Sequence, residues 1–483
     1  MARGSSGKPI CRWPFDSRWL VSATDEVARE ASVRFGGPLG RFGTLSDRSL
    51  IHALRFLALL ATVVHLLGYV MRLPCRLADF TNADRYPRMC YSDMPYLFGG
   101  RGFDVGHIPY LSAPPKGAES LEYPVLTGWF MHITGWLTAH TAPAGLAVNS
   151  RASVFYDWNT VLLGICLVVA VLAVALTVPG RPWDAALLAL APTIIMTGLI
   201  NWDLFAVALL AVCMLMWSRG RWVWAGVFMG LAVSAKFYPL VIIPAFVIVS
   251  WRNKHMRQLA PFAGAAVVSW LALNAPIAAI NMHEWAYFYT FSRTRGADFG
   301  SVWLASELLG GPALPIEQLN MWAAGIFGAL AAGITVVAFV AKQPPRLAQL
   351  AFLYVAAFCV SNKVYSPQYV LWLLPLAALA RPRWREYLVW QGSQVWYAVS
   401  VWLYLAAGDK LQGLNGVNYA WMILLTIAFT LWFSGLIVRD VLRPSDDIVR
   451  TGQQTPAVPD IEHPDASPLE SADTGLGAQH QVV

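Results

Sequence analysis

One polar stretch of the sequence, residues 73–123, lies between two strongly apolar segments and contains six carboxylates, five of which are candidates for chemistry. A carboxylate can act as a general base, for example by taking a proton from a hydroxyl group while its oxygen attacks a sugar carbon. When the leaving group is a phosphate, which departs without protonation, one such base is enough for an inverting transfer. Tyrosines lie close to several of these acids, and their rings could stack on sugars. The five are Asp79, Asp84, Asp93, Asp104 and Glu122.

A departing phosphate also needs cations that neutralise its charge. Arg293 and Arg295 lie two residues apart in a segment that also contains Phe, Ser and Thr, and Lys236 and Lys363 interrupt apolar stretches. These four side chains are the candidate ligands for the phosphate group of a sugar donor. The two arginines could equally bind lipid headgroups.

The composition predicts an all-α membrane protein. Of 483 residues, 57% are hydrophobic and 13% are charged, whereas soluble domains contain about 45–50% and about 25%. Apolar runs of about 15–25 residues recur along the chain, and a helix needs about 20 residues to cross a membrane. The net charge of +7 is spread over short connectors, which indicates membrane topology and no nucleic-acid partner. We therefore expect a multi-pass protein of the plasma membrane, in contact with membrane lipids.

The chain divides into a cytoplasmic N-terminal arm (1–49), a transmembrane region (50–440) and a disordered cytoplasmic tail (441–483). The arm contains a candidate amphipathic helix, Ser22 to Glu30. The transmembrane region reads as about 12 spans. They are placed at 50–72, 154–178, 183–199, 203–218, 222–236, 238–251, 257–281, 321–341, 346–362, 367–381, 384–407 and 416–438.

Five short basic connectors, which begin at Arg181, Arg219, Arg252, Lys342 and Arg381, fix the orientation of these spans. By the positive-inside rule they are cytoplasmic, and both termini then lie on the same side. The loops 73–123 and 282–320 lie outside, and the apolar stretch 124–140 is read as re-entrant or as lying flat on the outer face.

Under this topology the rare polar residues of the apolar region gather at the outer face. Ionisable groups at membrane depth are costly and usually mark a site or pair with one another. Asp203 and Lys236 could simply form such a pair that locks two helices. As a set, the residues instead predict a substrate-binding surface. Its candidate members, with Glu122, are Asp157, Asp203, Asn362 and Gln368.

Cys75 and Cys90 share the first outer loop, where oxidation is permitted. A disulfide between them would connect the end of the first helix to the segment just before Asp93. Cys166, Cys213 and Cys359 lie inside apolar runs and read as packing residues.

The sequence contains no pattern typical of a nucleotide, zinc or flavin site, so we predict neither a cofactor nor a metal.

Several short motifs resemble the type-C membrane glycosyltransferases, and more closely glycosyltransferase family 87, the polyprenyl-phosphomannose-dependent mannosyltransferases. The N-terminal arm is similar to an uncharacterised mycobacterial branch of membrane proteins. The motifs are SD at 92–93, GRG at 100–102, PY at 109–110, EYP at 122–124, NWD at 201–203, AKFYP at 235–239 and YSPQY at 365–369.

The resemblance implies a bundle of transmembrane helices with a catalytic acid in the first outer loop, and Asp93 matches that position. It also implies a polyprenyl-phosphate sugar donor and an envelope glycolipid or glycan as acceptor. Members of known activity tend to carry histidine just after the Ser-Pro of the later motif, where this chain has Gln368.

Asp93 is therefore the predicted general base. Asp79 and Asp84 lie among arginines and are expected to form ion pairs, while Asp104 follows a glycine-rich turn and reads as a loop-shaping residue. Glu122 could bind sugar hydroxyls or hold the loop.

Two functional interpretations remain, one as an enzyme and one as a non-enzymatic protein. The first is an inverting membrane glycosyltransferase that moves a sugar, which the resemblance implies to be mannose, on the outer side of the membrane. The second is a non-enzymatic membrane protein such as a lipid-linked sugar flippase or an envelope-assembly scaffold. A transporter should show internal repeats and polar residues near the middle of the bilayer. This sequence shows no repeat and places its polar residues at one face, which favours the enzyme.

Overall fold

The computed structural model describes residues 20–21 and 48–454. The candidate helix from Ser22 to Glu30, almost all of the N-terminal arm and the tail beyond residue 454 lie outside the described residues. Two short antiparallel strands, β1 (Leu20–Val21) and β2 (Arg48–Ser49), precede the first long helix. All other regular elements of the described chain are helical.

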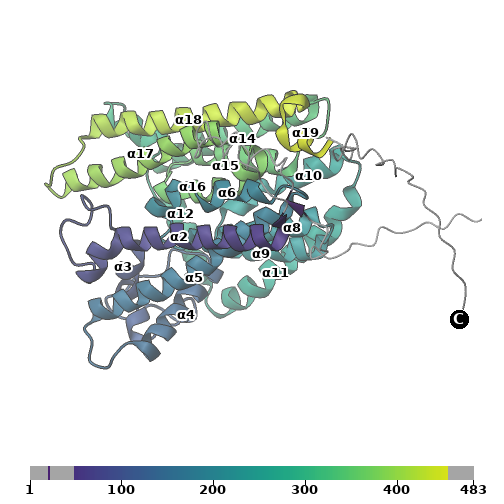
Figure 1. Ribbon diagram of the computed structural model, residues 1–483. Coiled ribbons are helices and arrows are strands. Elements are labelled where there is room, and N and C mark those ends of the chain that lie inside the picture. Colours follow the sequence, from purple (N-terminus) through teal and green to yellow (C-terminus); the bar gives the residue numbers. More distant parts are fainter. Residues whose placement is uncertain (1–19, 22–47, 455–483) are drawn as a thin grey trace, which may run out of the picture.

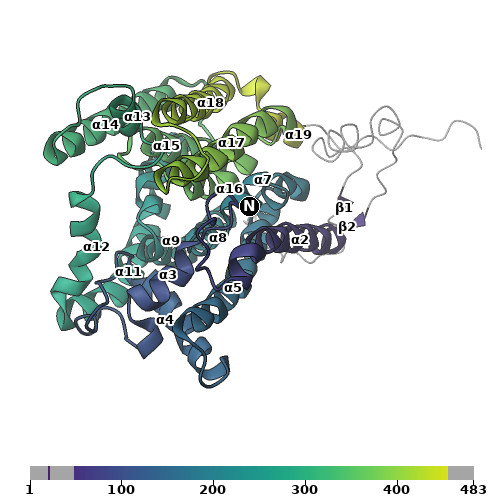
Figure 2. The ribbon, with the colours of Figure 1, turned by 90° about the vertical axis from the view of Figure 1, so that its left-hand side faces the viewer.

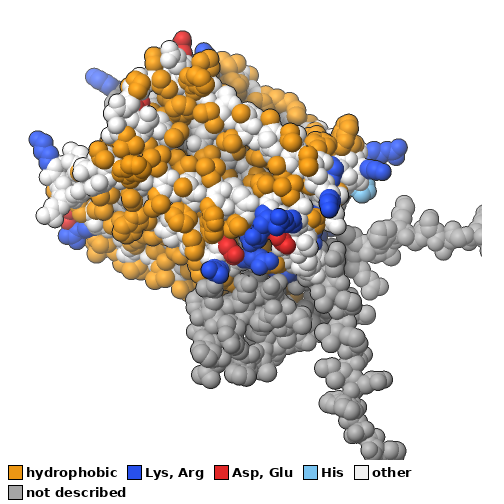
Figure 3. Space-filling view, turned by 90° about the horizontal axis from the view of Figure 1, so that it is seen from above, with side chains coloured by type: hydrophobic (Ala, Val, Ile, Leu, Met, Phe, Trp, Pro, Cys, Tyr) orange, Lys and Arg blue, Asp and Glu red, His pale blue; other side chains and the backbone are white. Residues whose placement is uncertain are grey.

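Five helices are long and apolar enough to cross a membrane. The apolar side chains on several of them face outward: Val268 is 66% exposed and Val340 is 69% exposed. Hydrophobic side chains cover most of the face seen in Figure 3, and Lys and Arg gather at its margins. The helices are α2 (Leu50–Leu77), α5 (Val148–Thr177), α11 (Leu259–Ile280, preceded by η4, Met256–Gln258), α14 (Ile316–Val340) and α18 (Gly416–Leu442).

Five further apolar segments are shorter than a full span. Two of these segments open with a 3₁₀ turn that continues into an α-helix, and the turns have Pro239 and Pro367 in their first two positions. The number of spans, predicted as about 12, remains a prediction. The segments are α8 (Asp203–Ser218), α9 (Trp222–Ala235), η3 with α10 (Tyr238–Ile242 and Ile243–Arg252), α15 (Leu347–Ser361) and η5 with α16 (Pro367–Tyr369 and Val370–Ala380).

The predicted span 183–199 is not one helix. It consists of η2 (Pro182–Ala185), α6 (Ala186–Ala189) and α7 (Pro192–Thr197). α7 ends at Thr197, and the fully buried Arg72 of α2 donates to two carbonyls in its last turn, Ile195 O at 2.9 Å and Met196 O at 2.7 Å.

The polar loops meet at one end of the helix bundle, which we call the cavity end. Asp93 N–H donates to Ile200 O (2.9 Å) and Asp298 N–H donates to Lys363 O (2.9 Å). In Figure 1 this end lies at the left, where α3 (Asp93–Gly100) and the turn between α17 (Trp384–Gly408) and α18 are found.

The basic connectors meet at the opposite end, which we call the basic end. Arg346 pairs with Asp447 at 2.7 Å and Arg381 pairs with Asp440. The predicted disordered tail therefore begins with ordered structure. Asp447 separates η6 (Pro444–Asp446) from α19 (Ile448–Gln454) and holds both against the connector before α15.

Several shorter elements complete the cavity end. Figure 2 shows α12 crossing this end from α11 toward α14. The stretch read as re-entrant or flat forms α4, which packs against α5 and α9. These elements are η1 (Phe103–Val105), α4 (Val125–Thr141), α12 (Met282–Thr294) and α13 (Val302–Leu308).

Candidate active site

A cavity of about 610 Å³ opens at the cavity end. Its wall combines segments that are far apart in the sequence: the start of α3, the loop before α4, the ends of α9 and α12, the turn before α16, and α17. Carboxylates, cations and aromatic rings all contribute to this wall. The charged members are Asp93, Glu122, Lys236, Arg295 and Asp298.

Asp93 is the first residue of α3, and its backbone is fixed on both sides. The preceding Ser92 caps the helix by accepting from Met94 N–H and also donates to Ile200 O at 3.1 Å. Burial raises the pKa of Asp93 to about 6, although a hydrogen bond from Tyr91 and the charge of Lys236 act in the opposite direction. A carboxylate with this pKa is largely ionised at neutral pH and still basic enough to accept a proton.

Glu122 lies in the same wall and is held by Arg101, whose Nε is 2.7 Å from Glu122 Oε2. Arg101 also contacts Glu119 at 3.0 Å. One carboxylate of the cavity is thus neutralised by its own arginine, whereas Asp93 has no ion pair among the described residues.

Lys236 follows α9 directly and binds Asp203, the first residue of α8, at 3.2 Å. Asp203 is fully buried and also accepts from Trp372 Nε1 at 2.6 Å. The Lys236 ammonium lies 4.9 Å from the centre of the Tyr123 ring and reaches the cavity wall. The pair that could lock two helices therefore exists, and its cation still faces the cavity.

Arg295 directly follows α12 and pairs with Asp298. It lines the main cavity and a second cavity of about 290 Å³, and Lys236 and Tyr369 likewise line both. The two volumes therefore adjoin, with two cations at their boundary.

The second cavity contains Asn362 and Lys363, together with several aromatic and apolar side chains. Lys363 Nζ donates to Arg293 O at 3.0 Å and to Asn320 Oδ1 at 2.7 Å. Burial and the nearby charge of Arg295 lower the pKa of Lys363.

The sequence model of glycosyltransferase family 87 matches residues 122–361. Residues 122–361 form a glycosyltransferase family 87 domain. A search of curated proteins gives no match to the chain. The family 87 domain supplies Glu122, Asp203, Lys236 and Arg295 to the site, while Asp93 precedes it and Lys363 follows it.

Three of the predicted site residues, Arg293, Asp157 and Asp203, line neither cavity. The Arg293 side chain is exposed and lines neither volume; only its backbone oxygen takes part, as the acceptor for Lys363. Asp157 instead binds Arg76 at 2.6 Å and accepts from the Tyr69 hydroxyl. Asp203 lies behind Lys236, and Gln368 lines the main cavity.

The other acids of the first loop have structural partners. Among the described residues Asp79 forms no ion pair with an arginine but accepts from Ser150 at 2.7 Å and Ser153 at 2.8 Å, at the start of α5. Asp84 pairs with Arg88, as expected. The backbone oxygen of Asp104 accepts from Arg151.

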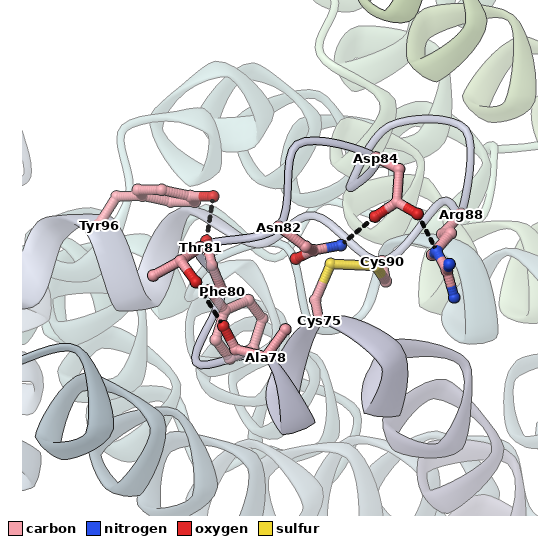
Figure 4. Close-up of a disulfide and its surroundings, with 9 residues drawn as sticks. All are labelled: Cys75, Ala78, Phe80, Thr81, Asn82, Asp84, Arg88, Cys90 and Tyr96. Atoms are coloured by element: carbon pink, nitrogen blue, oxygen red, sulfur yellow. Dashed lines mark hydrogen bonds and ion pairs between the residues drawn. A yellow bond between two sulfur atoms is a disulfide. The ribbon is translucent and has the colours of Figure 1, made fainter.

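Cys75 and Cys90 form a disulfide with their Cα atoms 5.6 Å apart. Figure 4 shows the bond at the base of a loop in which Asn82 and Arg88 both contact Asp84. The Tyr96 hydroxyl, which belongs to α3, donates to Phe80 O inside this loop at 2.9 Å. The bond therefore ties the segment before Asp93 to the end of α2.

Sequence reasoning missed Trp402 and Asp298, which both line the cavity. Trp402 lies on α17, in a stretch where tryptophan usually reads as an interfacial anchor, so its type carries no distinguishing signal. Within the described chain no group of three His, Cys, Asp or Glu side chains could hold a metal.

Proposed function

We propose that this protein is a membrane glycosyltransferase that moves a sugar, mannose, from a polyprenyl-phosphate donor to a hydroxyl group of an envelope glycolipid or glycan outside the membrane. One observation carries the proposal: within a chain that contains a family 87 domain, a single cavity combines the unpaired Asp93 carboxylate with Lys236 and Arg295.

The transfer needs one base and no protonation of the leaving group. An acceptor hydroxyl oxygen attacks the anomeric carbon, and Asp93 takes the hydroxyl proton. The bond between that carbon and the phosphate oxygen breaks, and its electron pair stays on the phosphate. The new bond forms on the face opposite the phosphate, so the configuration inverts.

Lys236 and Arg295 are placed to receive the negative charge that grows on the departing phosphate. Both line the boundary of the second cavity, where Lys363 adds a third cation. Aromatic and apolar side chains from α12 and α15, including Phe288 and Phe358, line the rest of that cavity and fit the first isoprene units of a polyprenyl chain.

Gln368 occupies the position at which characterised family members tend to carry histidine, and it lines the main cavity. A neutral amide cannot exchange a proton near neutral pH, so it can orient a sugar hydroxyl but cannot replace a base. In this chain the proton transfer is left to Asp93.

Replacing Asp93 with asparagine tests the proposal, because the change keeps the shape and removes the basicity. The purified variant, given a polyprenyl-phosphate sugar and an envelope glycolipid extract, should lose about 10²–10⁴-fold in transfer rate. Asp104→Asn, in the same loop but outside the main cavity, should transfer normally. Near wild-type transfer by Asp93→Asn would refute the base and favour the flippase or scaffold reading.

A further inference from the structure

Four aromatic side chains form one continuous part of the main cavity wall, which we call the aromatic wall: Tyr86, Tyr91, Tyr96 and Trp402. Ring centres of neighbouring members are 5.3 Å apart for Tyr91 and Tyr96, 5.4 Å for Tyr86 and Tyr91, and 5.4 Å for Tyr91 and Trp402. The rings thus contact one another, and the three tyrosines are at least partly exposed, so the wall offers more than one stacking position.

We propose that the aromatic wall binds the acceptor, and that the acceptor is an oligosaccharide chain whose last sugars stack on these rings. This inference rests on the proposed function and names the acceptor class for the same site.

The position of the base assigns the wall to the acceptor. Tyr91 precedes Asp93 by two residues and Tyr96 follows it by three, so both belong to the segment that holds the base. The base must contact the attacking hydroxyl. The donor phosphate is drawn instead to Lys236 and Arg295, at the boundary with the second cavity.

The polar character of the wall distinguishes a sugar from an acyl or isoprenoid chain. The Arg85 guanidinium lies 4.8 Å from the centre of the Tyr86 ring and 5.8 Å from that of Tyr96, and Arg85 also pairs with Asp409 at 3.6 Å. Aromatic rings next to fixed charges match a ligand with carbon–hydrogen faces and hydroxyl edges. The same cavity also contains the polar side chains of Asp93, Asn201 and Asp298, which a purely apolar chain would leave without partners in the ligand.

Trp402 supplies a second, independent observation. Its side chain is 3% exposed, and its indole N–H is buried without a hydrogen-bond partner. An unpaired buried donor destabilises the folded protein, so an apolar residue would suit a purely structural position better. At this position the indole backs the partly exposed rings of Tyr86 and Tyr91, and its removal would let both rings shift.

The disulfide fixes the outer part of the wall. Tyr86 lies within the loop that Cys75 and Cys90 close, and the Tyr96 hydroxyl is bonded to Phe80 O of the same loop. The pair between Arg85 and Asp409 joins this loop to the turn after α17, the helix that carries Trp402.

Direct binding tests the wall separately from catalysis. The full chain in nanodiscs, as the Asp93→Asn variant, is titrated with octyl α-mannosides of one, two and three sugars and followed by saturation-transfer NMR. Binding should strengthen from one sugar to two and three. Trp402→Leu should weaken trisaccharide binding by about tenfold, equivalent to about 1.4 kcal/mol, and should abolish the gain with chain length.

Trp396→Leu is the matched control, because Trp396 lies on the same helix, is 57% exposed and is outside the cavity. It should bind the mannosides like the parent protein. Tyr86→Leu, or reduction of the disulfide, should weaken the trisaccharide more than the monosaccharide.

Three results would overturn the inference: no mannoside binds, octanol competes as well as the trisaccharide, or Trp402→Leu weakens a polyprenyl-phosphate sugar as much as it weakens the trisaccharide. Each of these results would contradict acceptor binding by the aromatic wall and would leave the role of Asp93 as the base untouched. The base is judged independently, by the transfer rate of Asp93→Asn with the wall intact.

Discussion

At the residue scale, two of the three acids that line the cavity have contrasting surroundings. Glu122 pairs with Arg101, whereas Asp93 is half-buried without an ion pair among the described residues, and desolvation raises its pKa to about 6. The first turn of a helix favours a charged carboxylate. Burial disfavours that charge, and at Asp93 the effect of burial is larger.

Because a general base must be ionised, transfer should depend on the ionisation of Asp93. The kcat/KM for transfer should fall on the acid side of about pH 6, by about tenfold per pH unit. The Tyr91 hydrogen bond lowers the pKa of Asp93, so Tyr91→Phe should move the midpoint to higher pH. Tyr404→Phe, outside the cavity, should leave it in place. A profile without an acid limb would rule out Asp93 as the base.

Asp203 and Lys236 allow the structural and the catalytic role of one ion pair to be separated. Lys236→Met leaves the fully buried Asp203 without its cation and should destabilise the protein by about 3–5 kcal/mol. The double variant Lys236→Met/Asp203→Asn should recover much of that stability but not the affinity for the donor. Thermal unfolding in detergent and donor KM measure the two effects. Recovery of both would show that Lys236 only locks the helices.

At the element scale, most apolar segments could be placed from hydropathy alone, because a membrane helix needs a long run without charges. The break within residues 183–199 could not be placed in this way. Hydropathy does not register Pro192, which begins α7, and the carbonyls in the last turn of α7 are bonded by Arg72, more than 120 residues away in the sequence. Order in residues 448–454 was missed for a similar reason: Asp447 binds Arg346 and Gln349 of a distant connector.

The disulfide-closed loop is an element whose contribution can be measured. Cys75 and Cys90 are 15 positions apart, and the chain-entropy model gives about 3 kcal/mol for closing such a loop. Cys75→Ser/Cys90→Ser should lower thermal stability accordingly, while Cys166→Ser, which removes a cysteine outside the bond, should not. Equal stability of the double variant and the parent would contradict this assignment.

At the scale of the whole molecule, topology predicts which residues can meet, but helix phase decides which of them do. Asp93, Glu122, Lys236, Arg295 and Gln368 line one cavity. Arg293 and Arg295 were equivalent in sequence, yet only Arg295 points inward. Two residues correspond to about 200° around a helix, so neighbours at this spacing face opposite sides.

The two ends of the bundle should lie on opposite sides of the membrane. Reporter fusions after Arg221, Arg257 and Arg385 should read cytoplasmic, because these arginines belong to the connectors of the basic end. A fusion near Asp298, which lines the cavity, should read external. A cytoplasmic signal at Asp298 would place the cavity on the wrong side for an external acceptor.

The bond between Cys75 and Cys90 also has a consequence for biogenesis. Disulfides form and persist in oxidising compartments and are kept reduced in the cytosol. During insertion, the loop that carries Tyr86 would therefore stay open until it has crossed to the oxidising side. The helices can be in place before the acceptor surface is complete. We expect that, because of this order of assembly, the newly made protein does not bind the acceptor sugars in the compartment where it is synthesised.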